Sequence, residues 1–291
     1  MRDTVTPART RPRALPRLAR ITPFAALLPM AFTAIVAYIG CALWTLRVSF
    51  TSSRTFASSQ YIGLAQYERL FDNERWVLSL HNLALYGVLF IAACLVLGCL
   101  LAIFIDQNVT GEGVLRTVFL YPYAMSFVAT GLVWQWMLTP GQGFPFDWIV
   151  DQDMVIYTVV IATVWQAAGL VMAMVLAGLR GVDPEIWKAA RLDGIPAWRV
   201  YVSIVLPLLA PTLATVTLLL ATAVVKLFDA VVAMTQGGPG TASEVPAKFI
   251  MDHLFLRSNI GLASAGAMVL LAPVLAMLVP YAYARSRRVA A

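Results

Sequence analysis

The sequence predicts an all-α membrane protein with six transmembrane helices. Its 291 residues are 60% hydrophobic and only 12% charged, whereas a soluble domain is about half apolar and about a quarter charged. The charges are also unevenly placed, because six stretches of 26 to 30 residues contain no Asp, Glu, Lys or Arg. A bilayer core of about 30 Å needs about 20 apolar helical residues, so each stretch is long enough to cross it.

Each stretch is expected to form one continuous helix, because backbone polar groups cannot stay unpaired in hydrocarbon. The first follows an Arg-rich tail, as a secretory signal does, but its apolar run is too long and five comparable helices follow. We interpret it as a retained membrane helix. The six helices are expected at roughly 22–46, 83–105, 117–139, 155–179, 203–226 and 261–284.

The placement of Lys and Arg predicts the orientation, because cytoplasmic segments carry the excess of these residues. With the N-terminus inside, 14 of the 21 Lys and Arg residues are cytoplasmic, and the inner segments have a net charge of +8 against −2 outside. We therefore expect a basic cytoplasmic tail at 1–21, a membrane domain at 22–284 and a cytoplasmic tail at 285–291. The basic inner surface would attract anionic membrane lipid.

Several kinds of activity lack the residues that they require. The predicted helices are nearly free of ionisable groups, which argues against ion-coupled transport. The chain has no phosphate-binding loop, and His81 and His253 lie far apart without an HExxH pattern, so neither an ATPase nor an intramembrane enzyme is indicated. The basic tail has no aromatic residues beside it, so nucleic acid is not an expected partner. We expect Cys41, Cys94 and Cys99 to be buried small hydrophobic residues.

The loop between the fourth and fifth helices contains signals for a short helix. Asp183 is a suitable N-cap and Pro184 suits the first helical position. Gly194 suits a left-handed C-cap, and Pro196 prevents continuation. We expect a helix at about 184–193, on the cytoplasmic side, within a loop at 180–203.

This loop is similar to the EAA motif of permease subunits of binding-protein-dependent ABC importers. The motif reads E-A-A, two residues, D-G, nine residues, I-x-L-P. The residues at matching positions are Ala189, Ala190, Asp193, Gly194, Ile204, Leu206 and Pro207. The glutamate of the motif falls on Lys188, a charge reversal, and Glu185 lies almost one turn earlier.

Further segments resemble the sugar permeases of this family. Residues 235–240 read T-Q-G-G-P-G, like the T-x-G-G-P segment after the fifth helix. Residues 63–71 resemble the G-L-x-x-Y-x-x-L-F element after the first helix. The resemblance covers about residues 22–285 and is greatest to permeases for glucose, mannose or α-glucosides.

The resemblance implies a fold like that of type I ABC importers and a set of partner proteins. These are a second, related permease, two ATP-binding subunits and an extracytoplasmic solute-binding protein. ATP and Mg would be bound by the ATPase subunits, and this chain would hold no cofactor or metal and would not itself be an enzyme. The helix in the 180–203 loop would be the coupling helix, seated in a cleft of the ATPase. Its coupling residues would be Glu185, Lys188, Ala189, Ala190, Arg191, Asp193 and Gly194.

A pathway for the solute is expected along the fourth and fifth helices. The candidate residues are Thr163, Trp165, Gln166, Leu220, Ala223, Val224, Lys226, Leu227 and Asp229. Lys226 and Asp229 would share one helical face if the helix continued. Alternatives remain for each polar group: Gln166 could bond a neighbouring helix, and Lys226 and Asp229 could form an interfacial pair. Since the fifth-helix positions are mostly apolar, the partner permease could hold the solute, the cavity could be only a passage, or the solute could be small.

The sequence therefore indicates a multi-pass permease subunit of the bacterial inner membrane that carries a carbohydrate. The neighbouring alternative is an ABC permease for a non-sugar such as glycerol phosphate, for which Lys226 is the one cation near the helices. A membrane scaffold without a transport role is the alternative from another class. Gly261, Ala265 and Gly266 in the sixth helix form a small-residue face that would pack against its own chain or a partner.

Overall fold

The computed structural model describes residues 27–107 and 109–290. The chain forms two compact units, residues 1–47 and residues 48–291. Among its described residues, the first unit is helical from Leu27, with a π-helical stretch η1 (Ile35–Gly40) and the beginning of α2 (Cys41–Ser49). The predicted basic tail at 1–21 lies outside the described residues. Cys41 is exposed, so the prediction that all three cysteines are buried was wrong; Cys94 is buried and Cys99 half-buried.

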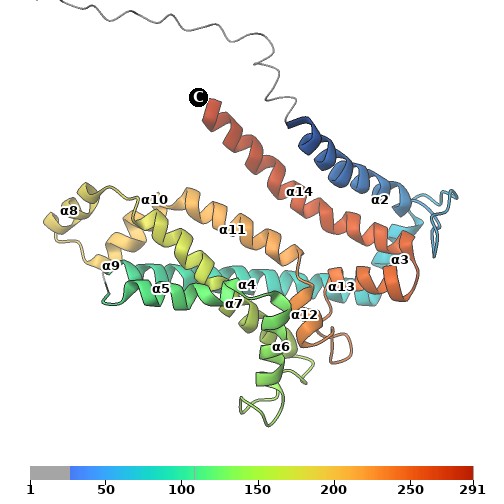
Figure 1. The fold of residues 1–291 in the computed structure, drawn as a ribbon, viewed down its shortest axis with the longest axis horizontal. Coiled ribbons are helices and arrows are strands. Elements are labelled where there is room, and N and C mark those ends of the chain that lie inside the picture. Colours follow the sequence, from blue (N-terminus) through green and yellow to red (C-terminus); the bar gives the residue numbers. More distant parts are fainter. Residues whose placement is uncertain (1–26, 108, 291) are drawn as a thin grey trace, which may run out of the picture. The chain divides into compact units, whose positions relative to one another are not determined.

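The described part of the second unit is built from helices (Figure 1), with one isolated β-bridge between Thr51 and Tyr61. In chain order the helices are α3 (Ala65–Phe71), α4 (Glu74–Asp106), α5 (Glu112–Leu120), the 3₁₀ helix η2 (Tyr121–Ala124), α6 (Phe127–Leu138), α7 (Val155–Leu179), α8 (Pro184–Leu192), α9 (Ala197–Val200), the π-helix η3 (Tyr201–Val205), α10 (Leu206–Leu208), α11 (Ala210–Val225), α12 (Asp229–Met234), α13 (Pro246–Met251), the π-helix η4 (Asp252–Leu256) and α14 (Ile260–Ala290).

Four described helices are long and apolar enough to cross a membrane: Leu27–Ser49, Glu74–Asp106, Val155–Leu179 and Ile260–Pro280. Two further helix pairs reach this length and composition together, but each is bent at a break, by 97° before α6 and by 72° before α11. The described chain thus has four candidate spans, or six if each bent pair is one span. The all-α membrane fold is confirmed, whereas the expectation that the third and fifth spans are continuous helices was wrong.

The third span was predicted as one helix at 117–139. Its break has a local cause. Pro122 lies in η2, and Met125 then adopts an extended conformation with ψ of 150°. Ser126 begins a new helix, because its side chain accepts a hydrogen bond from the backbone N–H of Ala129 over 3.1 Å. An N-cap serine satisfies a donor that the first helical turn leaves unpaired. The chain therefore turns here rather than continuing.

The fifth span, predicted at 203–226, is interrupted at Leu209, between α10 and α11. Pro207 and Pro211 flank the break. A proline inside a helix donates no backbone hydrogen bond and clashes with the preceding turn. The change of direction is therefore built into the sequence around Leu209.

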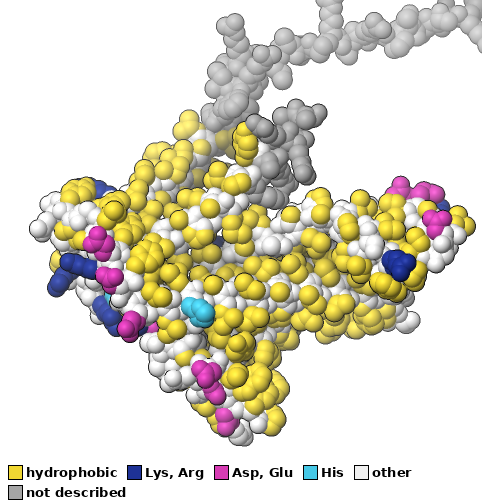
Figure 2. Space-filling model, turned by 180° about the vertical axis from the view of Figure 1, so that it is seen from behind, with side chains coloured by type: hydrophobic (Ala, Val, Ile, Leu, Met, Phe, Trp, Pro, Cys, Tyr) yellow, Lys and Arg dark blue, Asp and Glu magenta, His cyan; other side chains and the backbone are white. Residues whose placement is uncertain are grey.

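The surface of the second unit agrees with a lipid environment. Figure 2 shows hydrophobic side chains covering the middle of the visible face, while Lys, Arg, Asp and Glu gather at its extremities. Large apolar residues such as Val88, Val96 and Leu100 on α4 are more than half exposed. A soluble monomer rarely exposes so continuous an apolar surface.

The main core of the second unit lies between α4 and α7, which pack along each other. Next to it, α7 approaches the end of α5 very closely at Gly169. A Cβ atom placed on Gly169 would overlap the backbone carbonyl of Phe119. A backbone atom cannot move aside as a side chain can, so this contact requires glycine.

Gly169→Ala is expected to destabilise the protein by about 1–3 kcal/mol, the usual cost of overpacking a core. The midpoint of thermal unfolding in detergent measures this. Gly113→Ala is the matched control, because Gly113 is exposed on α5 and its added Cβ would meet nothing within 4 Å. Equal midpoints for the two variants would contradict the close approach at Gly169.

A second hydrophobic cluster joins α3, α4, α13 and α14 through Leu70, Trp76, Phe249, Leu262 and Ala265. The small-residue face of α14 packs here against its own chain. A Cβ atom on Gly261 would lie 2.6 Å from Nε2 of Gln66, and one on Gly266 would lie 3.3 Å from the Trp76 ring. These two glycines therefore pack against their own chain.

Charged groups pair beside this second cluster. Arg75 at the start of α4 binds both carboxylate oxygens of Glu244, whose side chain is 1% exposed. Lys248 binds Asp252 over 2.7 Å. Burial lowers the pKa of His253, so its ring is neutral near pH 7 and packs on Phe249 at a centroid distance of 4.0 Å. These contacts fasten the segment between α12 and α14 to the start of α4.

Candidate functional site

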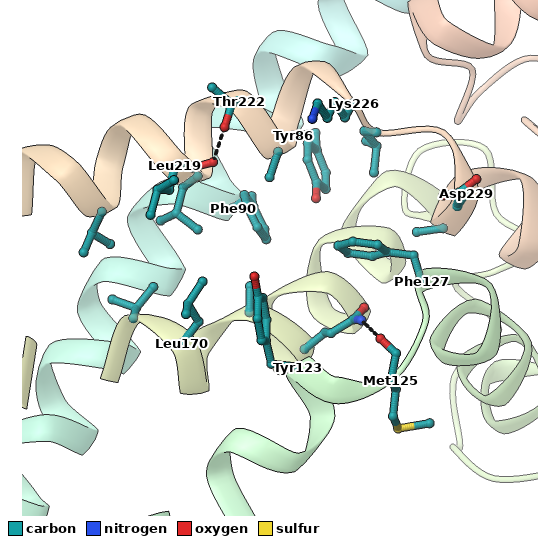
Figure 3. A pocket seen from close by; sticks show the side chains of 18 of the residues that line it. Tyr86, Phe90, Tyr123, Met125, Phe127, Leu170, Leu219, Thr222, Lys226 and Asp229 are labelled. Atoms are coloured by element: carbon teal, nitrogen blue, oxygen red, sulfur yellow. Dashed lines mark hydrogen bonds between the residues drawn. The ribbon is translucent and has the colours of Figure 1, made fainter. Parts of the chain in front are cut away.

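A cavity of about 440 Å³ lies within the second unit, between α4, α7, α11, the break before α6 and the turn between α11 and α12 (Figure 3). Its walls come from α4, η2, α6, α7, α11 and α12. A cavity of this size is in the range that holds small organic ligands. It is the first candidate for a solute site.

Aromatic side chains form much of the wall. Tyr86 and Phe90 lie one turn apart on α4 and stack with ring centroids 5.2 Å apart at an interplanar angle of 12°. Tyr123 from η2 and Phe127 from α6 also line the cavity. Flat apolar rings of this kind can cover the faces of a sugar ring, whose axial hydrogens are apolar.

Gln166 on α7 provides a hydrogen-bonding group at the cavity wall. The residue is only 1% exposed, and its Nε2 donates to the backbone carbonyl of Met125 over 2.7 Å. This bond orients the amide, since a carbonyl can only accept. The other end of the amide, Oε1, is buried and has no hydrogen-bond partner among the described residues. Leaving a buried acceptor unsatisfied costs about 1–3 kcal/mol, so this oxygen would accept a hydrogen bond from a solute hydroxyl if a local shift of the wall opened it to the cavity.

Lys226 and Asp229 both line the cavity, but not as one helical face. The helix α11 ends at Val225, and Phe228 has a φ of −140° before α12 begins at Asp229. The helix does not continue from Lys226 to Asp229, so the two residues do not share a helical face. Within the described residues they make no ion pair with each other. They are the two charged residues of the lining, one of each sign.

The structure brings together most of the predicted pathway residues. Those that line the cavity are Gln166, Leu220, Ala223, Lys226, Leu227 and Asp229. Thr163 is instead buried behind the wall, where its Oγ1 accepts a hydrogen bond from Tyr86 over 3.0 Å. Trp165 is 41% exposed and meets Trp134 edge-on. Val224 is buried against α4 beside Gly87.

Sequence reasoning missed the aromatic wall. Tyr86, Phe90 and Phe127 lie on the second and third spans, outside the pathway expected along the fourth and fifth helices. The four-residue spacing of Tyr86 and Phe90 places them on one face of a helix. That spacing was the available signal, although it does not say whether the face meets lipid or a cavity.

The predicted short helix in the 180–203 loop is present as α8. Asp183 caps it, because its Oδ1 accepts the backbone N–H of Glu185 over 2.9 Å. Gly194 follows with a φ of +67°, in the left-handed region. The helix therefore has the boundaries that its capping residues predict.

The two faces of α8 differ. Ile186 and Trp187 are half-buried and pack against the main core, together with Ala190, which is 4% exposed. Of the two alanines expected among the coupling residues, Ala190 is therefore buried against its own chain, whereas Ala189 is exposed. The residues on the exposed side are Glu185, Lys188, Ala189, Arg191, Leu192 and Asp193.

Lys188 and Glu185 neutralise each other on this exposed face. Nζ of Lys188 lies 2.9 Å from Oε1 of Glu185, and both side chains are more than half exposed. An exposed pair at this spacing contributes little to stability. The exposed face thus has a carboxylate, that of Glu185, near the position of the motif's glutamate. Lys188, which stands at the glutamate position itself, binds this carboxylate.

The chain is similar to known proteins over most of its length. Residues 94–288 match the family described as binding-protein-dependent transport system inner membrane component. The chain is 35% identical to a probable ABC transporter permease protein of Pyrococcus horikoshii, over 83% of this chain and 87% of that protein. It is 30% identical to the trehalose transport system permease protein of Mycobacterium tuberculosis, over 81% of this chain and 78% of that protein.

Two further proteins are similar to the chain. The chain is 28% identical to the sn-glycerol-3-phosphate transport system permease protein of Agrobacterium fabrum, over 89% of this chain and 92% of that protein. A crystal structure of a bacterial alginate ABC transporter, in complex with an alginate pentasaccharide-bound periplasmic protein, contains a chain with a similar fold. The TM-score is 0.78 with 19% sequence identity, over 94% of this chain and 96% of that one.

Proposed function

The chain belongs to the family of binding-protein-dependent transport system inner membrane components, and we propose that it is the permease subunit of an ATP-driven importer for a sugar. The cavity is the observation that carries this proposal. Stacked aromatic rings, the amide residue Gln166 in the lining and one positive and one negative charge suit a neutral polyol. The relative that transports trehalose supports the same solute class.

The energy for import would come from partner proteins. In the proposed assembly two ATP-binding subunits bind ATP and Mg, a second permease completes the pathway, and an extracytoplasmic binding protein delivers the sugar. The exposed face of α8, with Lys188, Arg191 and Leu192, would dock on an ATPase subunit. We infer that α8 and both chain ends lie in the cytoplasm, because Lys and Arg are in excess in these segments.

Copurification tests the assembly. The full chain, expressed with the genes that neighbour its own and extracted in mild detergent, is expected to bring down an ATPase with a phosphate-binding loop and a second permease. Binding assays on the cognate external binding protein, with a panel of neutral mono- and oligosaccharides, would then identify the sugar. Recovery of this chain as a stable monomer would contradict the proposal and favour a scaffold.

Glycerol phosphate is the second candidate solute, because Lys226 lies in the cavity and one relative transports it. A phosphate ester needs fixed positive charge along its path. Asp229 in the same lining offsets Lys226, so the lining has no net positive charge. This balance favours the neutral sugar.

Lys226→Gln is therefore expected to leave the choice of solute unchanged, with Asp229→Asn as the matched variant of opposite charge. Uptake of neutral sugars and of sn-glycerol 3-phosphate into proteoliposomes that contain the assembled transporter measures this. Uptake of the phosphate ester by the parent transporter, lost in K226Q and retained in D229N, would show that the solute is anionic.

A further inference from the structure

Trp187 connects α8 to the helix that follows it. The ring lies on the half-buried side of α8 and meets the ring of Tyr201 in η3 edge-on, with centroids 5.1 Å apart and an interplanar angle of 63°. Tyr201 is 7% exposed and belongs to the main core. A displacement of α8 toward or away from the core therefore pushes on this ring, because packed interiors have little free space.

The hydroxyl of Tyr201 continues the connection to α4. It donates to Oδ2 of Asp106 over 3.1 Å and accepts a hydrogen bond from Nε2 of Gln107 over 3.0 Å. Asp106 is the last residue of α4, and Gln107 is its C-cap. Tyr201 thus holds the end of α4 through two side-chain bonds, one of them to a carboxylate, and bonds to charged groups are the stronger ones.

The helix α4 leads from this contact to the cavity. Phe90 lies 16 residues before Asp106, which corresponds to about 24 Å along a helix axis. Tyr86 follows one turn further on, and both rings are part of the aromatic wall. The backbone connects α8 directly to α7 and to α9. Contacts through the side chains of Trp187 and Tyr201 add a second mechanical connection, from α8 to α4.

We propose that Tyr201 is a positioning residue that transmits the displacement of α8 to α4, and through α4 to the aromatic wall of the cavity. The inference rests on the proposed function, in which α8 docks on an ATPase subunit. A rigid-body shift of α8 moves the ring of Tyr201, and the hydroxyl moves the end of α4 with it. The ion pair between Arg180 and Glu112 joins the end of α7 to α5. Its side chains are much more exposed than Tyr201, and it does not reach α4.

Tyr201→Phe tests this in the complete transporter, reconstituted in proteoliposomes with its second permease, its ATPase and its loaded binding protein. The variant keeps the ring and its contact with Trp187 but loses both bonds of the hydroxyl. We expect ATP hydrolysis to remain stimulated by the loaded binding protein. Sugar taken up per ATP hydrolysed is expected to fall about tenfold, equivalent to about 1.4 kcal/mol of coupling.

A merely structural role predicts a different result. If Tyr201 only stabilised the fold, uptake and ATP hydrolysis would fall together with the amount of assembled complex, and the ratio would stay constant. An unchanged ratio in Tyr201→Phe therefore overturns the inference. Tyr157→Phe is the matched control, because it removes the hydroxyl of a tyrosine at the start of α7 that is 36% exposed, and it is expected to keep the parent ratio.

A double-mutant cycle identifies the partner. Asp106→Leu removes the carboxylate that accepts from Tyr201 and is expected to lower the ratio as Tyr201→Phe does, with no further loss in the double variant. Additive losses overturn the inference, since they would mean that the two residues act separately. Failure of the proposed function is distinct from these outcomes, because the parent complex would then take up no sugar at all.

Discussion

Replacing Gly194 with valine is expected to remove most sugar uptake while the membrane helices remain folded. Gly194 has a φ of +67°, and a Cβ atom there would meet nothing within 4 Å. The effect is therefore backbone strain alone, about 1–2 kcal/mol for an ordinary L-residue and more for a β-branched one. Relief of this strain changes the turn that joins α8 to α9 and misplaces the docking face. Uptake and ATP hydrolysis by the reconstituted transporter measure the loss.

Gly194→Asn is the matched control for this prediction, since asparagine tolerates the left-handed conformation better than other residues. It is expected to keep most of the uptake. Normal transport and normal stimulated ATP hydrolysis in Gly194→Val would show that the turn does not position a coupling helix.

Gln166→Leu is expected to lower uptake between about fivefold and about 150-fold, the range that corresponds to about 1–3 kcal/mol for a lost buried hydrogen bond. Leucine has a similar size but offers no acceptor to the cavity and no donor to Met125. The loss is expected in transport of the sugar, with assembly of the complex preserved. Size-exclusion chromatography and uptake in proteoliposomes measure these separately.

A set of monodeoxy analogues of the transported sugar distinguishes solute contact from packing. If Oε1 of Gln166 accepts a bond from one sugar hydroxyl, the analogue without that hydroxyl is carried equally by the parent and by Gln166→Leu. Every other analogue keeps the difference between the two proteins. A loss that is the same for all analogues would show that Gln166 only supports the break at Met125.

The parts of the fold that depend on local chemistry could be predicted from the sequence. The spans follow from the absence of charge, and α8 follows from Asp183, Pro184 and Gly194, which act on the backbone beside them. The broken helices could not be predicted in this way. Prolines such as Pro122 are tolerated inside transmembrane helices when neighbouring groups pair the freed backbone. At the break, Gln166 binds the carbonyl of Met125 from 41 residues further along the chain, a contact that no local pattern indicates.

The cavity illustrates the same limit for the site. Gln166, Lys226 and Asp229 could be selected because polar groups are rare in apolar segments. The aromatic wall has no such contrast, since Tyr86 and Phe90 resemble any other apolar residues of α4. Only the packing of α4 against α7 and α11 places them on the cavity rather than on lipid.

If a solute binds the amide of Gln166, cavity occupancy and backbone geometry become thermodynamically linked. The amide nitrogen holds the carbonyl of Met125 at the break between η2 and α6, while the amide oxygen is buried at the wall of the cavity that the residue lines. A solute that binds the oxygen and favours one orientation of the amide therefore also favours one conformation of the break. By reciprocity, any partner that stabilises that conformation raises the affinity for the solute by the same factor.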